Sequence, residues 1–104
     1  MYMRITWGKT FTAGWMETLP PDILDLSRFK PQGLQSRWVA RDAADPENYY
    51  SVTVFDTLEN LDGWENSRAY LEDYLPAVTR HLVGSHSSSV CKIEVGASSL
   101  PGAR

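Results

Sequence analysis

The sequence contains one cysteine, Cys91, and no long apolar run. A single cysteine cannot form an intrachain disulfide, and an isolated cysteine in a strand usually packs as a small apolar side chain. We therefore predict a protein of the reducing cytoplasm. No apolar segment approaches the roughly 18 residues that a membrane helix needs, and the first residues do not form a secretory signal. We expect no membrane association.

Basic charge is also scarce, with 10 Lys and Arg against 13 Asp and Glu and a net charge of -3. Nucleic-acid binding needs clustered Lys and Arg that neutralise phosphates, so we expect no nucleic-acid partner. The chain lacks a phosphate loop, a dinucleotide fingerprint and a nucleophile elbow. Its two histidines, His81 and His86, have a spacing that fits no common metal motif. We therefore expect no metal and no cofactor.

What the chain does have is the composition of a globular domain. It has 104 residues, of which 42% are hydrophobic and 22% charged. This size supports one modest core. We assign the domain to residues 1–95 and predict a loose tail at 96–104, which is small and polar apart from one leucine.

Alternation of residue types predicts four strands, because successive side chains of a strand point to opposite faces. The β-branched and aromatic run Tyr49–Phe55 has the strongest strand pattern. The predicted strands cover residues 1–9, 34–41, 49–55 and 90–95. The segment Gly84–Ser89 is predicted to be a flexible polar link.

Apolar residues at spacings of three and four predict two helical regions between these strands. The first covers residues 14–29 and is broken by Pro20-Pro21. The segment Pro31-Gln32-Gly33 that follows it terminates the helix. The second begins at Asp56, where Glu59 would complete a capping box, and Leu58, Leu61 and Trp64 would share its inner face. It resumes near Ser67 with a kink at Pro76. The apolar stripe of this last segment comprises Leu71, Tyr74, Leu75, Val78 and Leu82.

The order strand, helix, strand, strand, helix, strand predicts an α+β, ferredoxin-like βαββαβ sheet with its helices on one face. Both faces of the strand 49–55 are apolar: Tyr50, Val52 and Val54 alternate with Tyr49, Thr53 and Phe55. The face without helices would expose an apolar patch of the kind that marks an association surface. We therefore predict a two-fold homodimer through the sheet face.

Four segments resemble the antibiotic-biosynthesis-monooxygenase domain family of small dimeric α/β barrels. They are Ile5–Lys9 with Gly14-Trp15, Gly33–Asp42, Asp45–Asp56, and Glu59–Ser67, which ends in Trp-x-x-Ser. The resemblance spans about residues 3–95. It implies a dimer with a pocket between helices and sheet in each subunit. Some members oxygenate polycyclic aromatic substrates without metal or flavin, and others degrade haem.

The resemblance also assigns positions for a site. Ser51 and Phe55 stand where the cofactor-free oxygenases have an Asn and a Trp that hold the substrate. The haem degraders use an Asn, a helix Trp and a His, and the matching residues here are Trp7, Trp64 and Tyr74.

We predict seven substrate-contacting residues and assign no catalytic residue. Tryptophans suit an aromatic-lined pocket, and a histidine near a helix C-terminus suits either the helix dipole or proton transfer. The set is Trp7, Trp38, Ser51, Phe55, Trp64, Tyr74 and His81.

Three functions follow as hypotheses. The first is a cofactor-independent monooxygenase acting on a small aromatic or polyketide-like molecule. The second is a non-catalytic barrel of the same fold that binds a hydrophobic metabolite. The third is an RNA-recognition module, which shares the order of elements, but Pro46-Glu47-Asn48 lacks the basic residues that such a module places beside its aromatic residues.

Overall fold

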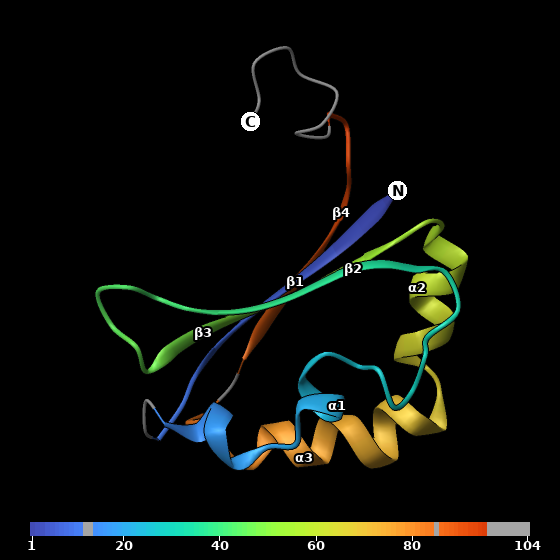
Figure 1. The fold of residues 1–104 in the computed structure, drawn as a ribbon. Helices are drawn as coiled ribbons and strands as arrows, with labels where there is room; N and C mark the ends of the chain where they lie inside the picture. Colours follow the sequence, from blue (N-terminus) through green and yellow to red (C-terminus); the bar gives the residue numbers. More distant parts are fainter. Residues whose placement is uncertain (12–13, 85, 96–104) are drawn as a thin grey trace.

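The structure is a computed structural model that describes residues 1–11, 14–84 and 86–95 of the chain. Four antiparallel strands form one sheet in the order β2-β3-β1-β4 (Figure 1). The strands are β1 (Tyr2–Lys9), β2 (Leu34–Arg41), β3 (Asn48–Phe55) and β4 (Ser87–Lys92). This order and the helices between the strands confirm the predicted α+β, ferredoxin-like fold.

The helices all lie on one face of the sheet (Figure 1). After β1 come a 3₁₀ turn, η1 (Trp15–Thr18), and a short helix, α1 (Pro21–Leu24), which confirms the break predicted at Pro20-Pro21. After β3 come α2 (Leu58–Glu65), a π-helical segment, η2 (Ala69–Tyr74), and α3 (Leu75–Thr79). None of the helices in the described ranges is long and apolar enough to cross a bilayer.

The core lies between the helices and the inner face of the sheet. Phe55 and Leu61 are fully buried there, and Leu26 is nearly so. Aromatic side chains fill much of the remaining space: Trp15, Tyr49, Trp64, Tyr70 and Tyr74 are each at most 8% exposed. Trp64 packs edge-on against Tyr70 with 5.4 Å between ring centroids.

Two predicted helix details differ from the structure. The N-cap of α2 is Thr57, whose hydroxyl accepts from the Asn60 amide, because the helix begins one residue later than a capping box at Asp56 requires. The predicted apolar faces are confirmed at Leu61, Trp64, Tyr74, Val78 and Leu82, but they differ at one position each. Leu58 and Leu71 are 40% and 49% exposed, while Tyr70 is buried. The π-helical segment widens the turn before Pro76, and this changes which side chains face the sheet.

Two strand details differ as well. β4 begins at Ser87, three residues before the predicted Val90, because Ser87 to Ser89 pair with Trp7 to Ile5 of β1. A register shift between Leu34 and Ser36 moves Leu34 to the helix side, where it packs on the core. The predicted tail, 96–104, lies outside the described residues.

The strand register determines which side chains face the helices. Arg4 and Thr6 of β1 pair with Thr53 and Ser51 of β3, and all four point toward the helix layer. The opposite face presents Trp7, Trp38 and Tyr50, which are 37%, 57% and 38% exposed. An apolar face without helices is therefore present, as the alternation predicted.

Candidate functional site

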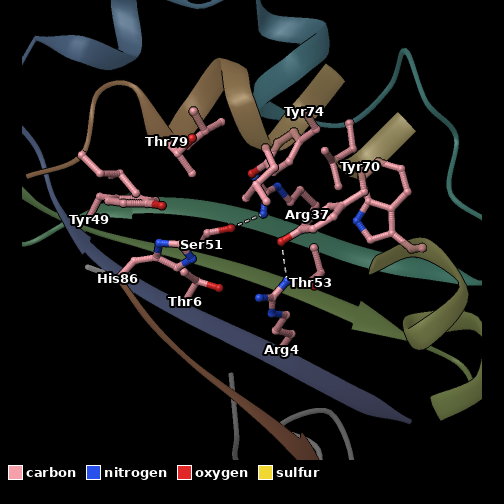
Figure 2. A pocket seen from close by; sticks show the side chains of 15 residues that line it. Arg4, Thr6, Arg37, Tyr49, Ser51, Thr53, Tyr70, Tyr74, Thr79 and His86 are labelled. Carbon is pink, nitrogen blue, oxygen red and sulfur yellow. Dashed lines mark hydrogen bonds between the residues drawn. The ribbon is translucent and has the colours of Figure 1, made fainter. Parts of the chain in front are cut away.

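A small cavity lies between the inner face of the sheet and the helices (Figure 2). Three strands supply its polar wall: β1 gives Arg4 and Thr6, β2 gives Arg37, and β3 gives Ser51 and Thr53. Its volume of about 30 Å³ is room for one or two water molecules. In this conformation side chains occupy most of the space between the two layers.

The helix segments supply an aromatic wall. Tyr70 and Tyr74 both come from η2, and their rings stack with centroids 5.6 Å apart and planes 23° from parallel. Residues four apart on a helical segment lie on one side of it, so both phenols point toward the sheet (Figure 2). Trp64 of α2 adds a third ring beside them.

Each tyrosine of the stacked pair accepts a hydrogen bond from a strand arginine. Arg4 Nη1 donates to Tyr70 Oη at 2.6 Å, and Arg37 Nη2 donates to Tyr74 Oη at 2.7 Å. The guanidinium carbons lie 5.6 Å and 5.7 Å from the centroids of the same rings. These contacts combine charge-assisted hydrogen bonds with cation–π attraction and hold the polar wall against the aromatic wall.

The two arginines differ in their ionic partners. Arg4 forms an ion pair with Glu65 of α2, with 2.5 Å between Nη1 and Oε2. Burial raises the pKa of the Glu65 carboxyl above its usual value, and Arg4 opposes that shift. Arg37 donates to the Leu24 carbonyl at 2.9 Å, to Ser51 Oγ and to Tyr74. Within the described ranges, Arg37 has no ion pair.

Buried tyrosine hydroxyls on the cavity stay protonated at neutral pH. Burial raises the pKa of the Tyr49 phenol far above its normal value. Burial also raises the pKa of Tyr70, although its hydrogen bond from Arg4 acts in the opposite direction. Both phenols are therefore hydrogen-bond donors toward the cavity rather than bases.

No family profile and no curated protein sequence matches the chain. Solved structures do. An antibiotic biosynthesis monooxygenase superposes with a TM-score of 0.72 at 13% identity, covering 89% of this chain and 98% of that one. A candidate antibiotic biosynthesis monooxygenase from Nitrosomonas europaea gives 0.73 at 13% identity, covering 91% and 100%. Rv0793 from Mycobacterium tuberculosis gives 0.69 at 14% identity, covering 93% and 99%.

The chain has the antibiotic-biosynthesis-monooxygenase fold. This confirms, at the level of fold, the resemblance found in the sequence. The near-complete coverage of both chains means that the βαββαβ unit is shared throughout, and not only one hairpin or helix pair.

Within this monooxygenase fold, three of the seven predicted substrate-contacting residues line the cavity. They are Ser51, Trp64 and Tyr74. Phe55 lies on the same strand face as Ser51 but is completely buried in the core. His81 packs against Trp15 with 5.8 Å between ring centroids, and its Nε2 is buried without a hydrogen-bond partner among the described residues.

Trp7 and Trp38 are placed elsewhere by the structure. Both lie on the sheet face that the helices leave open, because odd positions of β1 and even positions of β2 point away from the cavity. The haem-degrader positions are therefore not gathered: Trp7 is separated by the sheet from Trp64 and Tyr74. The residues present do not form the haem site that the resemblance describes.

Several cavity residues were not predicted, among them the charged and polar side chains of Arg4, Arg37, Tyr70 and His86. The alternation of β1 already placed Arg4 and Thr6 on the same face of the strand. It did not show that this is the face that the helices cover. Tyr70 was missed because the predicted stripe began at Leu71, which is exposed, and not at Tyr70. His86 was expected to be solvated, and it is exposed, but it also lines the cavity next to the start of β4.

A second, larger hollow adjoins the cavity. This groove has a volume of about 320 Å³ and is lined by residues around Phe29–Gln32 and along α2, including Gly63. Trp64 lines both the groove and the cavity, so the two hollows meet at this residue. Among the described residues, no group of three His, Cys, Asp or Glu side chains could hold a metal ion.

Proposed function

We propose that the protein is a cofactor-independent monooxygenase that acts on a small aromatic or polyketide-like substrate. The observation that supports this most is the cavity itself. It sets a stacked tyrosine pair and Trp64 opposite two arginines and three strand hydroxyls. Aromatic walls with a few convergent polar groups suit a flat ring that bears oxygen substituents.

In the proposed reaction the substrate supplies the electrons. An ionised phenol or enol passes electrons to O₂, one oxygen atom becomes a ring carbonyl, and the other leaves as water with the two hydrogens of the oxidised CH₂ group. The protein positions the substrate and excludes water. Arg4 and Arg37 would stabilise the negative charge of the ionised substrate, an effect that is strong where water is excluded.

The alternative is a non-catalytic barrel that binds a hydrophobic metabolite. The residues of the chain favour it, because Ser51, Phe55 and Tyr74 stand where the resemblance places an Asn, a Trp and a His. A ring could enter only if Trp64 moved toward the groove of about 320 Å³. Quenching of tryptophan fluorescence without product formation would favour this alternative.

Oxygen uptake tests the proposed function. Anthrone-like and hydroquinone substrates should be consumed with uptake of O₂, and Tyr74→Phe should lower the rate while the protein stays folded. Tyr50→Phe, on the opposite face of the sheet, makes the same chemical change and should leave the rate unaltered. Phe55→Ala is unsuitable, because removing a completely buried ring destabilises the core. No uptake with any of these substrates would refute the proposal.

We also propose that two copies associate through the open sheet face. Trp38 is 57% exposed there, and the same face presents Tyr50 of the neighbouring strand β3 and Trp7 of β1 beyond it. Burying a large apolar side chain contributes roughly 1.5–3 kcal/mol before ordering costs, so several such residues can hold a dimer. Analytical ultracentrifugation should find dimers at micromolar concentration, and lone protomers would refute this association.

A further inference from the structure

We propose that the cavity recognises an aromatic carboxylate, with Arg37 as the residue that binds the carboxylate group. This inference deepens the proposed function and rests on it for the aromatic nature of the ligand. Three features support it: the sign of charge around the cavity, the absence of an ionic partner at Arg37, and the direction of the hydrogen bonds.

The charge around the cavity is opposite to that of the chain. The chain has a net charge of -3, yet the charged side chains that line the cavity are those of Arg4 and Arg37, with no Asp or Glu of the described residues. A low-dielectric hollow lined by one sign of charge concentrates ions of the other sign. The ligand that fits this hollow is therefore an anion.

Arg37 is the cation that lacks an anion. The charge of Arg4 is balanced by Glu65 at 2.5 Å, whereas the three acceptors of Arg37 are all neutral. The Ser27 amide is the main cause that lowers the pKa of the Asp25 carboxyl and Arg37 is a minor one, and among the described residues the exposed Asp25 forms no ion pair with Arg37. Arg37 therefore offers a ligand a half-buried guanidinium whose charge no carboxylate balances, and a ligand anion can form charge-assisted hydrogen bonds with it.

The hydrogen bonds of the cavity leave donors rather than acceptors for a ligand. Ser51 and Tyr74 accept from Arg37, and Tyr70 accepts from Arg4, so the hydroxyl protons of all three remain to be donated. Arg37 uses three of the five N–H groups of a guanidinium, which leaves one on each terminal nitrogen. Two N–H groups and neighbouring hydroxyl donors match the two oxygens of a carboxylate.

Space for the ring comes from the groove. The cavity holds about 30 Å³, which a carboxylate group can take over from water. The attached ring needs more room, and the groove of about 320 Å³ shares Trp64 with the cavity. The ligand would therefore displace the Trp64 indole toward the groove, and its binding should change tryptophan fluorescence.

The test uses a matched pair of probes, naphthoate and the neutral naphthamide, titrated by fluorescence and by calorimetry. The wild-type protein should bind naphthoate about tenfold or more tightly than naphthamide, since a hydrogen bond to a charged group is worth that much. Arg37→Gln should reduce the naphthoate affinity to that of naphthamide. Arg37→Lys should keep the preference at lower affinity, because it retains the charge.

Arg68→Gln is the control. It removes the same charge from a side chain that is 89% exposed and does not line the cavity, so the preference should survive. Equal affinities in the wild type, a preference that persists in Arg37→Gln, or no binding of either probe would overturn the inference. Binding is measured without turnover, so a carboxylate preference in a protein that takes up no O₂ would refute the proposed function alone. Turnover without the preference would refute this inference alone.

Discussion

Gly8 is the position where the packing beside the cavity is tightest. It lies on β1 directly opposite Tyr49 of β3. A Cβ added at Gly8 would overlap Tyr49 Cε1 and would lie 3.2 Å from Leu82 Cδ2. Tyr49 has little room to move, because it is 4% exposed and packs edge-on against Trp15 with 5.0 Å between centroids. We predict that Gly8→Ala destabilises the protein.

The magnitude follows from two opposing effects. Overpacking a core costs typically about 1–3 kcal/mol. Replacing glycine by alanine recovers about 0.4–1 kcal/mol by restricting the unfolded chain. The expected net loss is therefore about 1–2 kcal/mol in the free energy of unfolding. For a domain of this size each kcal/mol lowers Tm by about 4–8 °C, so thermal unfolding followed by circular dichroism should resolve the change.

Gly63→Ala is the matched control. A Cβ at Gly63 meets no atom within 4 Å, and Gly63 lies inside α2, where alanine is the better helix former. This substitution should stabilise the protein by about 0.5–1 kcal/mol. In a Tyr49→Leu background, Gly8→Ala should cost less, because the obstructing ring is gone. A Gly8→Ala variant as stable as the wild type, or an unchanged cost in the Tyr49→Leu background, would refute the reasoning.

Three further predictions concern pH, capping and assembly. Burial raises the folded-state pKa of Tyr49 and Tyr70 above the unfolded value of 10.0, so the stability they contribute is present below that pH and lost as pH rises above it. In an alkaline titration, the phenolate absorbance of these two tyrosines should therefore appear only together with unfolding. Titration of all the tyrosines near pH 10 in the folded protein would contradict this. Thr57→Ala should lower the free energy of unfolding by about 1 kcal/mol in urea because the α2 cap is lost, whereas Thr57→Ser should not. Trp38→Glu should convert the proposed dimer to monomers in ultracentrifugation, while Leu71→Glu, exposed on the helix layer, should leave it intact.

The strands and their order could be predicted because their signals are local. The β-branched and aromatic run before Phe55 and the break at Pro20-Pro21 depend on backbone preferences that each segment carries by itself. The start of β4 was predicted three residues too late, at Val90, because the serines before Val90 have little preference for strands. The start at Ser87 comes from backbone pairing with β1, which belongs to a distant part of the chain.

The candidate site was only partly predictable for a related reason. Aromatic residues such as Trp64 stand out in a sequence, so the cavity was expected to be aromatic. The arginines did not stand out, because a charged residue in an alternating strand is normally exposed to solvent. Arg4 and Arg37 become cavity residues because the helices pack on their face of the sheet. Trp7 and Trp38 lie on the opposite face and stay outside the cavity.

Local chemistry in the sequence was enough to determine four strands, two interrupted helical regions and an apolar second face of the sheet. The tertiary structure decided which face became the inner one, which arginine received a counter-ion and how far apart the two walls of the cavity stand. The physical reason is that side-chain alternation has two equivalent phases. Packing against helices that come from elsewhere in the chain selects one of them.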